Sequence, residues 1–205
     1  MTKRYFATGL ILAAILAGSI LYFRSLIPVD LSANDSAKMK GNPSAPVEII
    51  EYSNFSCSHC HDVQPFIEML FEKYPGKIKL SFRHYPAFGE QSSFWAHVAA
   101  ECAASKGMFW KYHDKLFENQ KEWKTGPQPL VYFIRYAREL GMDAEDFSDC
   151  LSNDAMSQKV RKDDLSGLKS GFKTTPAFII NGEYFVGQKQ FEERAENKII
   201  AELEK

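Results

Sequence analysis

The stretch Val47-Glu48-Ile49-Ile50-Glu51-Tyr52, continued by Ser53-Asn54-Phe55-Ser56-Cys57-Ser58-His59-Cys60, decides the fold. Its first six residues are typical of a buried strand. The residues after Cys57 start a predicted helix that runs through Pro65 to about Tyr74, where Pro75-Gly76 ends it. The pair Cys57 and Cys60 is therefore predicted to lie where a strand meets a helix.

The rest of the chain predicts the other elements of the same domain. Residues 77–83 alternate polar and apolar side chains, as a second strand does. From about residue 90 to 170 apolar residues recur at helical spacing, and breaks divide this block into four or five helices. A hairpin follows over 176–186 with its turn at Asn181-Gly182, and a last helix over about 188–203. This order predicts an α/β fold with a mixed sheet flanked by helices, and a helical insertion before the C-terminal hairpin.

The spacing of Cys57 and Cys60 suits thiol chemistry. A thiolate is the reactive species in disulfide exchange. At a helix start the sulfur of Cys57 faces free backbone N–H groups and the positive end of the helix dipole, which lowers a cysteine pKa. His59 is expected to act in the same direction when it is protonated or donates a hydrogen bond. Cys60, one turn further along, is placed to resolve a mixed disulfide.

The segment from Ile50 to Cys60 resembles the active-site segment of DsbA-like oxidoreductases. Three later segments resemble landmarks of the same family, so that the resemblance runs from about Pro46 to the end: Arg83-His84-Tyr85-Pro86, Met108 to Phe117, and Thr174-Thr175-Pro176-Ala177-Phe178. The resemblance implies a thioredoxin-like fold with a helical insertion. It also implies protein substrates with thiols or disulfides, and no organic cofactor or metal.

The resemblance also implies roles for single residues. Cys57 would be the exposed nucleophile, and Pro176 a cis proline facing it. Thr175 would offer backbone hydrogen bonds to a substrate peptide, and Glu51 would be a buried acid that moves the proton of the resolving cysteine. Ser58 stands where many members have proline, in the dipeptide that tunes redox poise, so the resemblance leaves the direction of electron flow open.

The same cysteines allow other interpretations. Cys57-Ser58-His59-Cys60-His61 also satisfies the attachment motif of c-type haem. A copper or zinc module using Cys57, Cys60 and a histidine is a second alternative. A disulfide isomerase or reductase of the same fold is a third. The single histidines 84, 97 and 113 are predicted to be packing or surface residues, because no carboxylate or cysteine accompanies them at ligand spacing.

The two remaining cysteines are far apart in the chain. Cys102 and Cys150 lie on predicted helices at the two ends of the helical block. They are expected to form either a structural disulfide or a pair of buried small hydrophobic residues.

The N-terminus points to export. No residue from Tyr5 to Phe23 is charged, and this length favours a membrane anchor in residues 1–27 over a cleaved signal. Residues 28–45 are then a linker, and 46–205 the folded domain. We expect the domain on the outer side of the membrane, periplasmic or at the cell surface, where disulfides persist. Expected partners are exported proteins and a membrane redox partner. Nucleic acid is excluded, because 25 basic and 26 acidic residues are well mixed. The predicted activity is disulfide formation through Cys57 and Cys60.

Overall fold

The computed structural model of the chain describes residues 35–86 and 91–205. The run 5–23, on which the anchor prediction rests, lies outside the described residues, as do residues 28–34 of the predicted linker. Among the helices of the described part, none is long and apolar enough to cross a membrane.

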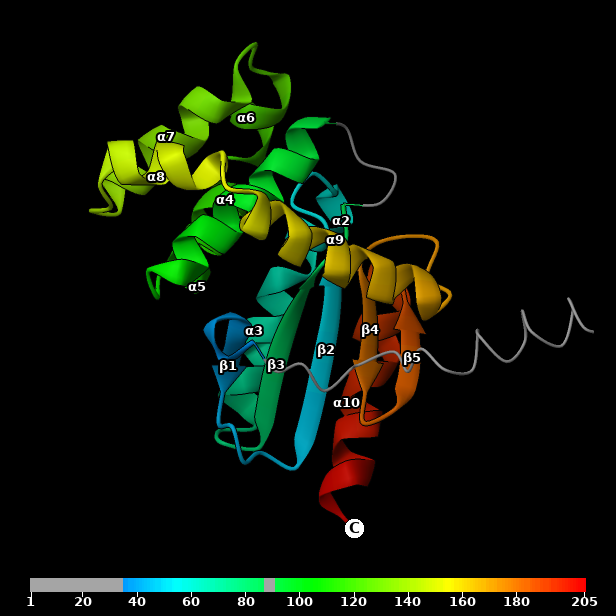
Figure 1. Cartoon of the computed structure of the whole chain (residues 1–205). Helices are drawn as coiled ribbons and strands as arrows, with labels where there is room; N and C mark the ends of the chain where they lie inside the picture. Colours follow the sequence, from blue (N-terminus) through cyan, green and yellow to red (C-terminus); the bar gives the residue numbers. More distant parts are fainter. Residues whose placement is uncertain (1–34, 87–90) are drawn as a thin grey trace, which may run out of the picture. The chain divides into compact units, whose positions relative to one another are not determined.

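A five-stranded mixed sheet forms the centre of the fold (Figure 1). Its strands are β1 (Met39–Gly41), β2 (Val47–Ser53), β3 (Ile78–His84), β4 (Ala177–Ile180) and β5 (Glu183–Val186). They lie in the order β1-β3-β2-β4-β5. The pair β2 and β3 is parallel and the other pairs are antiparallel. The predicted strand that leads to Cys57 is thus the central strand.

One face of the sheet is covered by α3 (Gln64–Lys73) and α10 (Gln188–Leu203). Apolar side chains that alternate along the strands meet this helical layer, and burial of such surface is the main stabilising term of a fold. The core on this face includes Val47, Ile49, Leu80 and Phe178 from the sheet, and Ile67, Leu70, Phe191 and Ile199 from the two helices. On the other face Tyr52 donates to or accepts from Ser166 Oγ at 3.0 Å. Ser166 belongs to α9 (Asp154–Lys169), which crosses that face.

The chain between β3 and β4 is the predicted helical insertion. Its described helices are α4 (Gln91–Ser105), α5 (Phe109–Glu118), α6 (Gln120–Thr125), α7 (Pro129–Glu139), α8 (Ala144–Leu151) and α9. These are six helices, where four or five were predicted. The difference arises at Asn119 and at Ser152-Asn153, where helices end without a glycine or proline. Figure 1 shows α4 to α8 grouped at the end of the sheet where β2 meets α2 (Ser58–Asp62).

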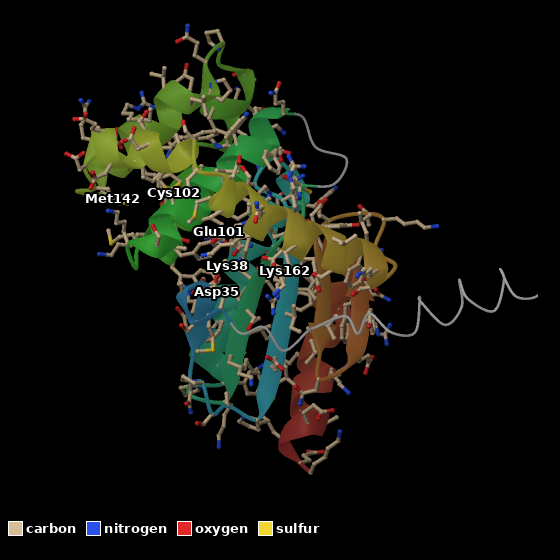
Figure 2. The ribbon with its side chains drawn as sticks, viewed as in Figure 1. Asp35, Lys38, Glu101, Cys102, Met142 and Lys162 are labelled. Atoms are coloured by element: carbon tan, nitrogen blue, oxygen red, sulfur yellow. A yellow bond between two sulfur atoms is a disulfide. The ribbon has the colours of Figure 1, made fainter. Side chains whose placement is uncertain are left out.

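Cys102 and Cys150 form a disulfide in this structure, with an S–S distance of 2.08 Å. It joins α4 to α8, and Cys102 is labelled in Figure 2. Of the two expectations for this pair, the structure contains the bonded one.

The structure differs from the predicted linker over Ser36–Gly41. Ser36–Lys38 form a 3₁₀ helix, and Met39–Gly41 are β1, which pairs with β3. The side chain of Lys38 is 3% exposed, and Trp110 Nε1 donates to the carbonyl oxygen of Met39 at 3.0 Å. Polar composition suggested a tether here, but the segment packs on the domain because a buried charge partner for its lysine lies elsewhere in the chain.

Candidate active site

The end of β2 places the two cysteines differently. Cys57 is the N-cap residue of α2, and its extended backbone turns the chain out of the sheet into that helix. Cys57 is partly exposed, whereas Cys60 is fully buried. The predicted strand-to-helix junction is confirmed, and one thiol of the pair reaches solvent while the other faces the core.

The loop between β2 and α2 is fixed by polar side chains that sequence reasoning missed. Asn54 Oδ1 accepts hydrogen bonds from Ser56 N at 2.9 Å and from Ser93 Oγ at 2.6 Å. Gln120 Nε2 donates to the carbonyl oxygens of Phe55 at 2.8 Å and Cys57 at 2.9 Å. Because these bonds satisfy the backbone on both sides of the turn, the position of the Cys57 sulfur is set by the insertion as well as by β2.

The peptide bond between Thr175 and Pro176 is cis, as the resemblance implied. Cys57 Sγ lies 3.5 Å from the carbonyl oxygen of Thr175. The N–H of Gly187 donates to the carbonyl oxygen of Pro176 at 2.8 Å. The loop before β4 and the start of α10 are therefore held together beside the exposed thiol.

The two thiols have opposite acidities. A hydrogen bond from the Cys60 thiol, with smaller contributions from Thr175 and the backbone N–H groups of Cys60 and His59, lowers the pKa of Cys57 to about 5 against the effect of burial. Burial raises the pKa of Cys60 well above its ordinary value, and the hydrogen bond to Cys57 acts in the same direction. At neutral pH Cys57 is thus the nucleophile and Cys60 the group that keeps a proton.

His59 and Ser58 occupy the exposed surface between the cysteines. The Nδ1 atom of the His59 ring lies 3.1 Å from Gln188 Oε1. The contribution of His59 to the acidity of Cys57 comes from its backbone N–H, which the sequence-based interpretation of the imidazole did not include. A groove of about 420 Å³ adjoins the site and is lined by His59, Thr174, Thr175, Val186, Gly187, Gln188, Lys189 and Glu192.

Glu51 lies behind the cysteine pair and is fully buried. Burial raises the pKa of this carboxyl group, against smaller opposing effects. Gln64 Nε2 donates to Glu51 Oε1 at 3.1 Å and to the carbonyl oxygen of Cys60 at 2.9 Å, so that one amide ties the acid to the resolving cysteine. A buried carboxyl group with a raised pKa holds its proton more tightly than an exposed one and can act as a general acid or base.

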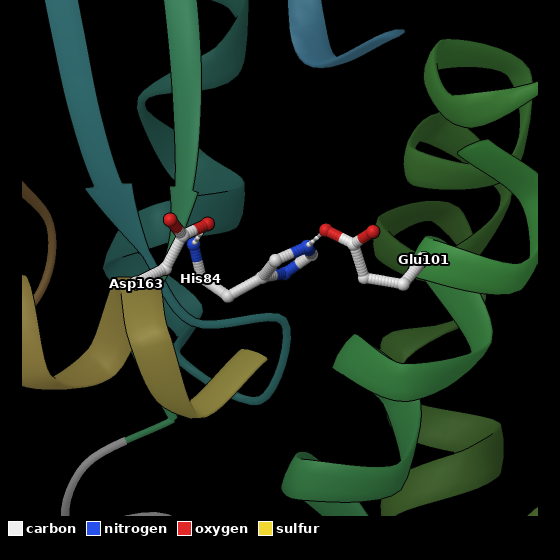
Figure 3. A group of neighbouring side chains, drawn as sticks. All are labelled: His84, Glu101 and Asp163. Carbon is white, nitrogen blue, oxygen red and sulfur yellow. Dashed lines mark hydrogen bonds and ion pairs between the residues drawn. The ribbon is translucent and has the colours of Figure 1, made fainter. Parts of the chain in front are cut away.

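A second buried polar group joins β3, α4 and α9 (Figure 3). His84 Nε2 lies 2.8 Å from Glu101 Oε1, and Asp163 Oδ2 accepts from His84 N at 3.2 Å. Within the described residues these three side chains are the one set whose possible ligand atoms lie within 4.8 Å of one another. The ammonium group of Lys38 already binds both carboxylates, at 2.5 Å from Glu101 and 2.8 Å from Asp163. The set is therefore a charge network in which a lysine supplies the cation.

The metal and haem alternatives find no support in the arrangement around Cys57. Cys60 Sγ is buried and accepts from Asn54 N at 3.4 Å. The ring of His61 lies 2.9 Å from Asp62, and that of His59 faces Gln188. Two thiols and an imidazole are thus not gathered around one point, which a zinc or copper site requires.

Comparisons with known proteins agree with this geometry. A family model described as thioredoxin matches residues 34–197. A protein of Bacillus cereus named "Probable disulfide bond formation protein D" is 29% identical over 162 residues, which cover 75% of this chain and 74% of that protein. A protein of Salinispora tropica named "Na(+)/H(+) antiporter NhaA 3" is 30% identical over 168 residues, and the chain spans 24% of its length.

Solved structures show the same fold. The thiol-disulfide exchange protein alpha-DsbA2 of Wolbachia pipientis has a TM-score of 0.68 and 25% sequence identity, over 84% of this chain and 88% of that one. Oxidised BdbD of Bacillus subtilis has a TM-score of 0.70 and 22% identity, over 82% and 93% of the two chains. With the family model covering most of the residues, the CxxC pair at the start of α2 and the cis proline beside it, the chain belongs to the thioredoxin family, in its DsbA-like branch.

Proposed function

We propose that the chain is an extracytoplasmic protein thiol oxidase, which transfers the Cys57–Cys60 disulfide to exported proteins. The observation that carries the proposal is the division of labour within the pair: an accessible thiol with its pKa lowered to about 5, backed by a buried thiol with a raised pKa. A stabilised thiolate favours the reduced form of the pair. Its disulfide is therefore a strong oxidant that readily accepts electrons from substrate thiols.

Substrate docking follows from the surroundings of Cys57. We assign the groove beside the cis Thr175–Pro176 bond to an extended substrate segment that carries the reacting cysteine. Val186, at the end of β5, is 45% exposed and lines the same groove, where it offers an apolar contact. Exposed apolar surface suits unfolded chains, which present apolar side chains.

The direction of electron flow is supported by a relative. The Bacillus cereus protein is named for disulfide bond formation, and the match covers about three quarters of both chains. Export is supported by the uncharged run 5–23 and by the disulfide between Cys102 and Cys150, since such bonds persist in oxidising compartments. Reoxidation then requires a redox partner at the membrane that accepts two electrons from the reduced pair.

The reduction potential of the Cys57–Cys60 pair tests the oxidase assignment. Equilibration with glutathione should give a value near that of strong oxidants, about −120 mV, and a value near −270 mV, about that of thioredoxin, would assign a reductase instead. Oxidation of a reduced, unfolded test protein should be lost in Cys57→Ser. The matched control is Cys102→Ala with Cys150→Ala, which removes the other cysteine pair, the structural disulfide, and should leave oxidation in place.

A further inference from the structure

Three buried polar atoms on β2 and α5 have no hydrogen-bond partner within residues 35–86 and 91–205. They are Glu51 Oε2, Ser53 Oγ and His113 Nε2. Glu51 and Ser53 are fully buried, and His113 is 2% exposed. Native proteins rarely leave buried polar atoms unsatisfied, and ordered water or a functional role explains most exceptions. The three atoms therefore call for a shared explanation.

His113 and Glu51 come from different elements but share a neighbour. Glu51 on β2 pairs in register with Phe82 on β3. The ring centroid of His113 lies 5.4 Å from that of Phe82. The other rings packed on His113 belong to Phe55, Phe109, Trp110 and Phe117. In this apolar setting the two titratable groups interact: burial raises the pKa of Glu51, and the charge of His113 opposes it.

Ser53 links the same acid to the resolving cysteine. Burial raises the pKa of both Glu51 and Cys60, and the Ser53 hydroxyl beside them acts in the opposite direction on each. Glu51 and Cys60 are also joined by the amide of Gln64. Ser53 thus lies beside the thiol that must gain and lose a proton in each turnover, and Glu51 is tied through Gln64 to the backbone of the same cysteine.

The far side of His113 leads to solvent. His113 Nδ1 lies 2.8 Å from Asp114 Oδ1, and the Asp114 side chain is 63% exposed. Asp114 and Gln64 line one surface pocket of about 320 Å³. The residues in its wall with ionisable side chains are Lys40, His61, Glu68, Asp114 and Glu118. Glu51 and His113 are therefore each one hydrogen bond behind the wall of this pocket.

We propose that His113, together with Asp114, carries the proton that Glu51 exchanges with Cys60 to and from solvent at the Gln64–Asp114 pocket. The inference rests on the proposed thiol-disulfide function and names a residue that supports it. When His113 is in its neutral form with Nδ1–H donating to Asp114, its Nε2 can accept a hydrogen bond, and bridging water joins the unpartnered atoms. His113 acts through Glu51, so it is a positioning residue for the proton rather than a catalytic residue.

The proton count of one turnover balances along this path. A substrate thiolate attacks Cys57 Sγ, a new S–S bond forms, and the Cys57–Cys60 bond breaks with its electron pair on Cys60. Cys60 takes a proton from Glu51, and Glu51 regains one from solvent by way of His113. A second substrate thiolate then attacks the substrate sulfur of the mixed disulfide, which forms the substrate disulfide and releases Cys57 as a thiolate. When the Cys57 thiolate attacks a disulfide of an oxidant, a mixed disulfide forms and one oxidant thiolate leaves. Cys60 then gives its proton to Glu51, attacks Cys57 Sγ, and releases the second oxidant thiolate. The proton of Glu51 then leaves by the same path.

The test separates the two steps of oxidation by glutathione disulfide. In the full-length reduced chain, attack by Cys57 forms a mixed disulfide, and attack by Cys60 resolves it; acid quench and mass spectrometry give both rates. His113→Phe keeps the aromatic packing and removes the relay. We expect the rate of mixed-disulfide formation to stay within about twofold of that of the unmodified chain. The rate of resolution by Cys60 should be about tenfold lower at pH 7, a smaller loss than the usual 10²–10⁴-fold contribution of a direct acid or base. Increasing imidazole buffer, which fits the pocket, should restore the second rate.

Tyr112→Phe is the matched control. It removes a buried hydroxyl from the neighbouring position of α5, where Tyr112 donates to Phe133 O at 2.8 Å, and should change neither rate. An unchanged second rate in His113→Phe, an equal fall of both rates, or the same fall in Tyr112→Phe would overturn the relay. Should His113→Phe fail to fold, the surface substitution Asp114→Asn replaces it. A rate of mixed-disulfide resolution by Cys60 that is about threefold lower, with the same imidazole dependence, supports the relay. An unchanged resolution rate rejects it. Absence of any mixed disulfide on Cys57 in the unmodified chain would instead refute the proposed function.

Discussion

Replacing Lys38 with methionine is expected to destabilise the domain by about 3 kcal/mol, although the residue lies far from the cysteines in sequence. Its ammonium group is bound between Glu101 Oε1 at 2.5 Å and Asp163 Oδ2 at 2.8 Å (Figure 2 labels Lys38 and Glu101). All three side chains are at most 7% exposed. Methionine fills a similar volume, so the change removes the charge and little packing.

The magnitude follows from what remains in the site. Breaking a buried ion pair by removal of one partner costs about 3–5 kcal/mol, because the other charge stays buried. Arg83 remains 3.3 Å from Asp163, and Lys159 remains 3.2 Å from Glu101. Because these cations partly compensate, we expect the lower end of that range. For a domain of this size the loss corresponds to a Tm lower by about 6–12 °C.

The effect should depend on pH in a defined direction. Burial alone would raise the pKa of Glu101, but the hydrogen bond from His84 and the charge of Lys38 hold it well below its usual range. A lowered carboxyl pKa contributes stability that is present above the unfolded value of about 4.3 and is lost as pH falls toward the folded value. Without Lys38 the carboxylates accept protons more readily. The deficit of Lys38→Met should therefore be full near pH 7 and smaller at pH 4.

Urea unfolding followed by circular dichroism at pH 7 and pH 4 measures this deficit. Lys40→Met is the matched control, since Lys40 lies two residues further along the same segment in an exposed pair with Glu68, and such pairs contribute at most about 1 kcal/mol. Equal effects of the two substitutions at pH 7, or a deficit of Lys38→Met that grows in acid, would refute the reasoning.

Three further outcomes are expected. Glu51→Gln should stabilise the fold by about 1 kcal/mol at pH 7 and not at pH 4. Burial raises the pKa of Glu51, so its ionised form opposes folding as pH rises. Thermal unfolding at both pH values measures the difference. Cys60→Ala should raise the pKa of Cys57 above about 5, since the Cys60 thiol is its main hydrogen-bond donor. Thiolate absorbance at 240 nm follows the titration of Cys57. An unchanged titration curve would show that the Cys60 thiol does not lower this pKa. Joint replacement of Cys102 and Cys150 by alanine should cost about 4 kcal/mol in urea unfolding, from a sequence separation of 48, and leave the Cys57 titration unaltered.

The parts of the fold that sequence analysis predicted are those determined by neighbouring residues. The strand before Cys57, the helix start at the cysteines and the hairpin turn depend on local pattern, and Asn181 and Gly182 have the positive φ angles of 43° and 86° that such a turn requires. The cis peptide before Pro176 was available through resemblance, because local pattern does not determine an isomer.

The missed features depend on partners far away in the chain. Lys38 looked like part of a linker because its carboxylate partners lie 63 and 125 residues further on. Gln120, which fixes the loop at Cys57, lies 63 residues after that cysteine and forms part of a short helix with no sequence signal of its own. Long-range hydrogen bonds of this kind leave no periodic pattern, so composition alone did not identify them.

Two buried histidine systems next to Phe55 show why burial by itself does not identify a proton path. On one side Phe55 N donates to His97 Nε2 at 3.4 Å, so His97 Nδ1 carries the hydrogen for His84 Nδ1 at 2.8 Å, and His84 Nε2 donates to Glu101. Burial lowers the pKa of both rings and keeps them neutral, and every ring nitrogen has a partner. In this series of hydrogen bonds each group can donate in one direction only, which suits the two histidines to hold the loop at Phe55 in place. On the other side, within the part of the chain that the structure describes, His113 has a hydrogen-bond partner at Nδ1 only, and that partner reaches solvent. The Nε2 atom of His113 is therefore available for a new hydrogen bond, whereas the fully satisfied pair cannot form one without breaking its own bonds.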